Sequence, residues 1–158
     1  MPLVLRKSRP ADREAIARYL EERWGSTQIA LRGRLVDAAE LPAITSEPVG
    51  AALATYDPEA GELISIDATE RGTGVGTALV EAVSAELARL GHESMRVTTT
   101  NDNLDALRFY QRRGFRIAAI RVGAVKGARL QKPTIPLEGQ FGIPIRDEID
   151  LVLELPQG

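Results

Sequence analysis

Three glycines at alternate positions, Gly72, Gly74 and Gly76, follow an apolar alternating segment and precede a helical pattern. Without Cβ atoms, their backbone can approach a ligand closely. The first turn of the helix that follows presents unpaired N–H groups and the positive end of the helix dipole. We therefore predict that this turn binds an anion, and specifically a pyrophosphate.

Two classes of enzyme use such a turn: dinucleotide-binding proteins and acyl-CoA-dependent N-acyltransferases. The dinucleotide fingerprint G-x-G-x-x-G does not fit, because counting from Gly72 the last glycine comes one position early and Thr77 stands in its place. The acidic residue that should close the next strand is also missing, since residues 95–100 end in three threonines. The sequence disfavours dinucleotide binding.

Read as R-x-x-G-x-G, with Arg71, Gly74 and Gly76 in the named places, the turn resembles the pyrophosphate signature of the GNAT N-acetyltransferase superfamily. A second motif lies downstream, where residues 101–115 are similar to that family's N-x-x-A-x-x-F-Y-x-x-x-G-F block. The two motifs together are specific, and the resemblance covers residues 51–115.

The resemblance implies that acetyl-CoA is the cosubstrate and that backbone groups bind it. Strand residues 66 and 68 would contact the pantetheine amides, and the N–H groups of the turn would surround the pyrophosphate. Arg71 has two interpretations, a phosphate contact or an exposed charge. The amide of Asn101 would bond the cofactor or a strand end. The predicted cofactor-binding set is Ile66, Asp67, Ala68, Arg71, Gly72, Thr73, Gly74, Val75, Gly76, Thr77, Asn101 and Ala106.

The implied reaction is attack of a neutral amine on the thioester, through a tetrahedral oxyanion, with loss of the CoA thiolate. Tyr110 matches the family's proton donor to the thiolate, although a buried structural tyrosine is the alternative. A backbone N–H near Ile66 or Asp67 would hold the oxyanion. The first candidate base is Glu62, expected on one strand face with Ile66; Asp67, Glu22 and a water chain remain alternatives.

The expected elements place these residues. A short strand at 3–5, a helix at 10–24 and a hairpin at 41–45 and 50–56 come before a strand at 62–68. Apolar spacing predicts a helix from Val75 to a stop at Gly91, and a strand follows at 95–99. Residues 26–40 are ambiguous, because their apolar positions suit a short helix that Gly33 interrupts.

The strand-helix-strand unit at 64–99 requires a right-handed crossover, so its two strands should be parallel. Together with the resemblance, this predicts an α/β (α+β) fold of GNAT type, with a mostly antiparallel sheet, one parallel splayed pair and flanking helices. The length of 158 residues fits a single domain, 1–158. Strands at 116–122 and 149–155 should enclose a long proline-containing loop, 123–147, interpreted as a flap over the acceptor or a dimer contact.

Composition excludes several other functions. The chain has no cysteine and one histidine, so we expect neither disulfides nor a metal site. A net charge of -2 gives no general attraction to nucleic acid or lipid, and no apolar stretch approaches a membrane span, so we expect a cytoplasmic protein. A run of basic residues without acids between 106 and 137 is read either as a solvated surface or as an anion-facing patch.

These observations predict an N-acetyltransferase that moves acetyl from acetyl-CoA to a primary amine of a small molecule or peptide, by direct attack in a ternary complex. The absence of cysteine agrees with direct transfer, since no thioester enzyme intermediate can form. The alternative is a non-catalytic acyl-CoA-binding or regulatory module of the same fold. A homodimer is among the expected assemblies.

Overall fold

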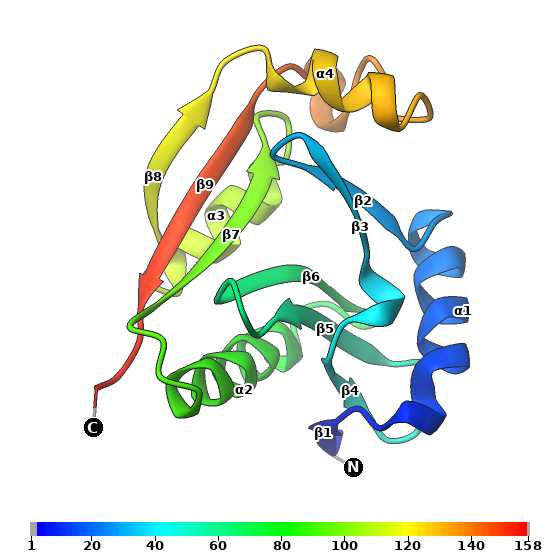
Figure 1. Ribbon diagram of the computed structural model, residues 1–158, viewed down its shortest axis with the longest axis vertical. Coiled ribbons are helices and arrows are strands. Elements are labelled where there is room, and N and C mark those ends of the chain that lie inside the picture. The colour runs from blue at the N-terminus through cyan, green and yellow to red at the C-terminus, as the bar shows by residue number, and fades with distance from the viewer. Residues whose placement is uncertain (1–2, 158) are drawn as a thin grey trace. The chain divides into compact units, whose positions relative to one another are not determined.

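The computed structural model describes residues 3–157. Its strands are β1 (Leu5–Lys7), β2 (Gln28–Leu31), β3 (Arg34–Asp37), β4 (Ala43–Ser46), β5 (Ala52–Asp57), β6 (Glu62–Ala68), β7 (Ser94–Thr100), β8 (Arg116–Arg121) and β9 (Glu148–Glu154). Its α-helices are α1 (Arg13–Trp24), α2 (Val75–Arg89), α3 (Leu104–Arg112) and α4 (Ala124–Gln131), and short 3-10 turns are η1 (Pro10–Asp12), η2 (Ala38–Glu40) and η3 (Gln140–Gly142). Figure 1 shows these elements in chain order by colour.

The strand order is β1-β4-β5-β6-β7-β9-β8, with β2 and β3 forming a separate two-stranded sheet. The fold is mixed α/β with mostly antiparallel pairing and one parallel pair, β6 and β7, as predicted. The chain divides into two compact units, one of residues 3–28, 37–95 and 155–157 and one of residues 29–36 and 96–154. The expectation of a single domain over 1–158 stays a prediction.

In the first unit, β1, β4, β5 and β6 pair antiparallel, and a helix covers each face of this sheet (Figure 1). Tyr19 of α1 bonds Asp67 on one face of β6. On the other face, Tyr56 of β5 is close enough to Glu86 and Arg89 of α2 for their charges to act on it. Residues that alternate along β5 and β6 therefore meet different helices.

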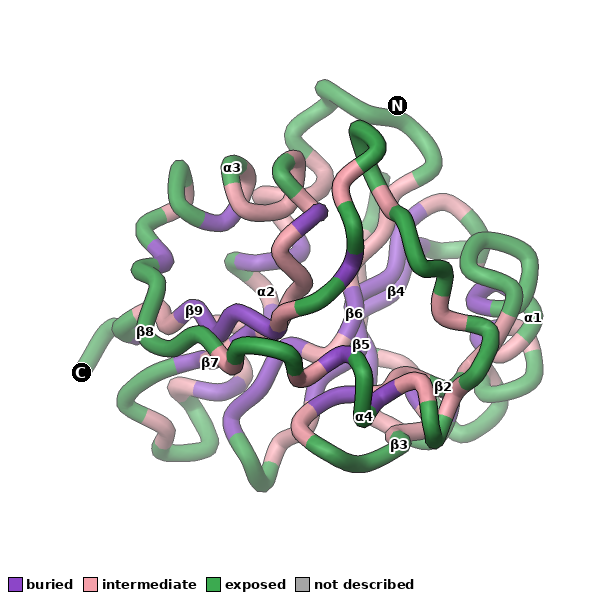
Figure 2. Tube along the Cα trace, turned by 90° about the horizontal axis from the view of Figure 1, so that it is seen from above, coloured by how far each residue is buried: buried purple, intermediate pink, exposed green. Residues whose placement is uncertain are grey.

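The core of this unit includes leucines from α1, from the strands and from α2. Leu20, Leu53, Leu63, Leu79 and Leu87 are almost completely buried, and Figure 2 shows buried positions concentrated along β4, β5 and β6. The leucines of α2 recur at the helical spacing that the sequence predicts for residues 75–90. Within the part of the chain described, no helix combines the length and apolar character that crossing a bilayer would need.

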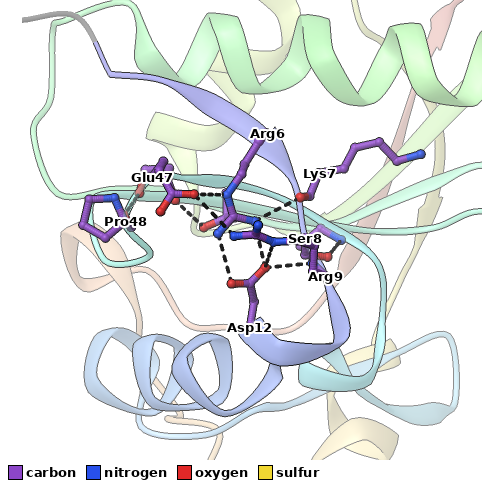
Figure 3. Close-up of polar contacts among 10 residues, drawn as sticks. Arg6, Lys7, Ser8, Arg9, Asp12, Glu47 and Pro48 are labelled. Atoms are coloured by element: carbon purple, nitrogen blue, oxygen red, sulfur yellow. Dashed lines mark hydrogen bonds and ion pairs between the residues drawn. The ribbon is translucent and has the colours of Figure 1, made fainter.

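A charged cluster fixes the entry to α1 (Figure 3). The guanidinium of Arg6 donates to both carboxylate oxygens of Asp12, at 2.8 and 3.0 Å, and also to Glu47 of the β4–β5 turn. The backbone N–H of Arg9 donates to Asp12 at 2.7 Å. These contacts, with that of Arg6 foremost, hold the pKa of Asp12 well below its usual range. The start of the helix that carries Tyr19 is thereby tied to β1.

In the second unit, β8 pairs antiparallel with β9, and the tip of the β2–β3 hairpin belongs to the same unit. Arg32 and Gly33 form the two-residue turn, with φ of 45° and 79°. Two left-handed residues give the twist that a tight hairpin needs. The helical reading of residues 26–40 is therefore wrong, because Gly33 makes a turn between two alternating strands.

Arg32 also anchors this hairpin tip within the unit. Its backbone N–H donates to Glu148 at 3.1 Å, and its guanidinium donates to Thr98 at 2.8 Å. Thr98 in turn donates to Asp150, which shares the guanidinium of Arg121 with Glu148. The left-handed backbone of Arg32 is held by a network that reaches β7, β8 and β9.

The long segment 123–147 contains regular structure. It includes α4 and η3, and a bridge joins Glu138 to Pro144. The Arg129 guanidinium donates to the carbonyls of Pro136 and Ile145, at 2.7 and 2.8 Å. The segment predicted as a loop thus includes a helix, α4, and its function as a flap or dimer contact stays a prediction.

The phenol groups of all three tyrosines should ionise at a higher pH than the phenol of an unfolded chain. Burial raises the pKa of Tyr19, Tyr56 and Tyr110 above the usual value, and the Asp67 carboxylate adds to the effect at Tyr19. An unfolded tyrosine ionises near pH 10. The stability from these neutral phenols is thus complete below about pH 10 and is lost as pH rises through the higher folded pKa values.

Absorbance of tyrosinate and far-UV circular dichroism, followed together in an alkaline titration, check this expectation. We expect tyrosinate to form only as the chain unfolds. Full ionisation of three tyrosines near pH 10 with the helices intact would contradict it.

Candidate functional site

The predicted anion-binding turn connects β6 to α2. Gly72 and Gly74 have φ of 73° and 81°, which is the left-handed region that favours glycine. Gly74 is the N-cap of α2 and contributes no side-chain cap. A Cβ added to Gly72 or Gly74 would meet no atom within 4 Å, so the space over the turn is open. The exposed turn and the uncapped helix start fit a bound pyrophosphate.

The backbone groups of β6 at the predicted positions alternate in direction, toward β5 and away from it. Thr69 N–H donates to the carbonyl of Ala51 at 2.9 Å, so these two residues are a hydrogen-bonded pair. In an antiparallel pair, hydrogen-bonded and non-hydrogen-bonded positions alternate, so Asp67 and Leu53 form the next hydrogen-bonded pair. Ile66 and Ala68 occupy the non-hydrogen-bonded positions on either side of Asp67. The N–H and C=O groups of Ile66 and Ala68 therefore point away from β5. Those of Asp67 point toward it.

A β-bulge moves Glu62 away from its predicted face. Thr55 pairs with Ser65 but Tyr56 pairs with Leu63, so β6 has one extra residue between them. Glu62 then lies opposite Asp57, on the face of Ser65 and Asp67. The prediction that Glu62 shares a face with Ile66 is wrong, because the bulge reverses the alternation.

Glu62 is fully buried at the start of β6. Ile66 is four residue steps along the extended chain from Glu62, which corresponds to about 13 Å. Between Glu62 and Asp67 on this face, the hydroxyls of Thr55 and Ser65 bond each other at 2.5 Å. The hydroxyl groups of Thr55 and Ser65, which can donate or accept a hydrogen bond, therefore lie between the carboxylates of Glu62 and Asp67.

Asp67 is held by two side chains of α1. Its Oδ2 accepts from the hydroxyl of Tyr19 at 2.8 Å and from Nε of Arg23 at 2.6 Å. Its Oδ1 has one longer contact, 3.3 Å from Nη2 of Arg23. Sequence reasoning did not assign Tyr19 and Arg23 to the site. Their spacing of four residues, which puts both on one helix face, is the signal that was available.

Asn101 lies in the second unit and binds the chain just before β9. Its Oδ1 accepts from the N–H groups of Arg146 and Asp147, at 2.9 and 3.0 Å, and its Nδ2 donates to the carbonyl of Pro144 at 2.9 Å. Of its two predicted roles, the structure shows contact with a strand end. Cofactor binding by Asn101 stays a prediction.

Asn103 caps α3 and Ala106 lies in its first turn. Asn103 Oδ1 accepts from the Ala106 N–H at 3.2 Å, so that N–H is used by the cap. Gln140 donates to the same oxygen at 3.0 Å and connects the cap to segment 123–147. Ala106 therefore presents its methyl group and carbonyl, and not its N–H, for any contact with a ligand.

Tyr110 is the buried residue of α3, with 6% of its surface exposed. Its ring packs edge-on against Phe109, with centroids 5.5 Å apart, and against Phe115 at 5.2 Å. Among residues 3–157 its hydroxyl has no hydrogen-bonded partner. Burial raises its pKa, so the phenol keeps its proton well above neutral pH. This is the protonation state that a general acid needs.

Several side chains of the basic run at 106–137 have partners within the protein. Arg108 pairs with Asp105, Arg121 with Glu148 and Asp150, and Arg129 with backbone carbonyls. This favours the interpretation of a structural and solvated surface. In the first unit, by contrast, Arg71 is exposed in the glycine turn and forms no ion pair with any described residue, as a phosphate contact requires.

The predicted residues divide between the two units, with Glu62, residues 66–68 and the glycine turn in the first and Asn101, Ala106 and Tyr110 in the second. Across residues 3–157, no three His, Asp or Glu side chains gather as ligands for a metal ion.

Comparison with known proteins gives consistent results. The model of the acetyltransferase (GNAT) family matches residues 7–115. The uncharacterized protein YxbD of Bacillus subtilis is 35% identical over 148 residues, covering 90% of this chain and 93% of its own. A GNAT acetyltransferase from Elizabethkingia anophelis, solved with acetyl-CoA bound, has a TM-score of 0.65 at 20% identity, with coverage of 97% and 98%. An acetyltransferase from Bacillus subtilis in complex with CoA has a TM-score of 0.63 at 19% identity, with coverage of 98% and 100%.

Proposed function

Because the chain belongs to the acetyltransferase (GNAT) family, we propose that it transfers an acetyl group from acetyl-CoA to a primary amine of a small molecule or peptide, by direct attack. The observation that carries this proposal is the side of β6 that faces away from β5, which leads into the open glycine turn. The backbone groups of Ile66 and Ala68 point to that side, and the uncapped start of α2 follows. Acetyl-CoA, which the solved relatives bind, supplies matching amides and a pyrophosphate.

The chain has a residue for each step of this reaction. The N–H of Ile66 or Ala68 stabilises the oxyanion. The N–H of Asp67, which the sequence also suggested for this role, points toward β5 and is therefore not assigned to it. Tyr110 donates its proton to the departing thiolate. Arg71 and the N–H groups of residues 72–77 bind the pyrophosphate. Asn101 and Ala106 are proposed to contact the cofactor through groups that their hydrogen bonds leave available.

Glu62, the proposed base, lies about 13 Å from Ile66 along the strand, which is too far for direct contact with an amine at Ile66. We propose that it receives the proton of the amine through intervening carriers, among them the hydroxyls of Ser65 and Thr55. The protein is proposed to work in the cytoplasm, and segment 123–147 to cover the acceptor or form a dimer contact.

Glu62→Gln should lower kcat/KM by about tenfold at neutral pH. The loss should shrink as pH approaches 10, where an alkylamine is neutral without assistance. A pH profile of the variant checks this, with Glu59→Gln, in the nearby exposed turn, as the control. A profile that matches the unmodified protein would remove Glu62 from the mechanism.

The transfer itself is tested by release of free CoA thiol from acetyl-CoA with ethanolamine, putrescine, L-lysine, glucosamine and an alanine-terminated tripeptide. The cysteine-free chain gives no thiol background. We expect at least one amine to raise thiol release above the rate with acetyl-CoA alone. Tight binding of acetyl-CoA without release by any amine would favour the non-catalytic acyl-CoA-binding module.

A further inference from the structure

Asp67 is a carboxylate whose two oxygens differ in their surroundings. Oδ2 is occupied by Tyr19 and by the shorter contact to Arg23, whereas Oδ1 has only the 3.3 Å contact. A carboxylate oxygen can accept about two hydrogen bonds. Oδ1 therefore keeps acceptor capacity in a fixed orientation.

The position of Asp67 makes the free acceptor capacity of Oδ1 suitable for binding a ligand. It lies between Ile66 and Ala68, whose backbone groups point away from β5, while its own side chain faces α1. With 16% of its side-chain surface exposed, it is shielded but reachable. Reduced contact with water strengthens the attraction between a carboxylate and an ammonium group.

The two partners from α1 restrict how Asp67 can turn. Tyr19 is buried, with 5% of its surface exposed, and its raised pKa keeps it a donor at all ordinary pH values. The Arg23 side chain is 40% exposed and contacts Asp67 with two nitrogens, a fork geometry that fixes the carboxylate plane. Neither residue needs to touch an acceptor to affect it.

We propose that Tyr19 and Arg23 are positioning residues that present Oδ1 of Asp67 to the ammonium group of the acceptor. This inference rests on the proposed function and adds its acceptor-binding element. The chemical class it selects is a primary amine that arrives protonated. The Asp67 carboxylate accepts one hydrogen bond from an N–H of the ammonium group. The proton that the ammonium group must lose before attack moves to Glu62 through the carriers named above, among them the hydroxyls of Ser65 and Thr55.

The test compares three variants, Tyr19→Phe, Arg23→Gln and Asp67→Asn, using the most reactive amine of the five-amine panel. Tyr56→Phe controls for loss of a buried hydroxyl on the opposite face, and Arg18→Gln controls for loss of an exposed charge on α1. We expect Asp67→Asn to raise KM for the amine about tenfold or more, and the other two variants about threefold to tenfold. The affinity for acetyl-CoA should stay within about twofold.

Thermal unfolding is recorded for each variant, because a purely structural contact would lower Tm and leave KM for the amine unchanged. That result in Tyr19→Phe and Arg23→Gln would overturn the inference while leaving the proposed function intact. Should Asp67→Asn fail to fold, the exposed Arg23→Gln still decides the outcome. Absence of transfer by the unmodified protein to all five amines would overturn the proposed function and this inference with it.

Discussion

Tyr110→Phe is expected to lower kcat for acetyl transfer by about a hundredfold, because a thiolate must then leave without a general acid. Phenylalanine keeps the ring contacts with Phe109 and Phe115, so the fold and the affinity for acetyl-CoA should stay nearly unchanged. Steady-state kinetics with the most reactive amine measure the loss.

Tyr56→Phe is the matched control, since Tyr56 is also buried but lies among the residues that face α2. A Tyr110→Phe enzyme with unchanged kcat would leave Tyr110 as a core residue and require another proton donor. A fall in kcat of the same size in both variants would point to a general effect of removing buried hydroxyls.

Gly139→Ala is expected to lower the free energy of unfolding by about 2 kcal/mol. A Cβ at this position would overlap Oδ2 of Asp102 and lie 2.9 Å from a side-chain carbon of Ile145. Asp102 is 5% exposed and cannot move freely, because it accepts from the hydroxyl of Thr100 and from the N–H of Gln140. Either the chain at Gly139 shifts or these bonds break.

Gly127→Ala is the control for this substitution. Gly127 lies inside α4, where a Cβ would meet nothing within 4 Å, so alanine should raise stability by up to about 1 kcal/mol through its higher helix propensity. Denaturant unfolding of both variants measures the difference. Equal stabilities would show that segment 123–147 accommodates the added carbon and is more loosely held than its contacts indicate.

The sequence was most informative where function depends on the backbone. Glycines at 72 and 74 predicted a turn that a ligand can approach closely, and the structure has both in the left-handed region with open space over them. The alternation at 62–68 and the helical spacing from Val75 predicted the strand and helix on either side. Local geometry of this kind is set by residues near in sequence, so the pattern is sufficient.

The sequence was least informative where one extra residue in a strand moves a side chain to the other face of the sheet. Nothing in residues 62–68 marks the bulge opposite Thr55, which depends on how two strands pair, and it moved Glu62 to the side of Asp67. The partners of Asn101 lie more than 40 positions away, beyond a segment whose path no pattern predicts. Tyr19 and Arg23 had the right spacing, but their partner could be found only from the packing of α1 on β6.

Calorimetric titration with acetyl-CoA, with NAD as the competing ligand class, tests the central claim most directly. The open glycine turn and the backbone groups of Ile66 and Ala68 that point away from β5 predict binding of acetyl-CoA with a micromolar Kd, about -8 kcal/mol, and no heat with NAD. No binding of acetyl-CoA, or a preference for NAD, would contradict the account.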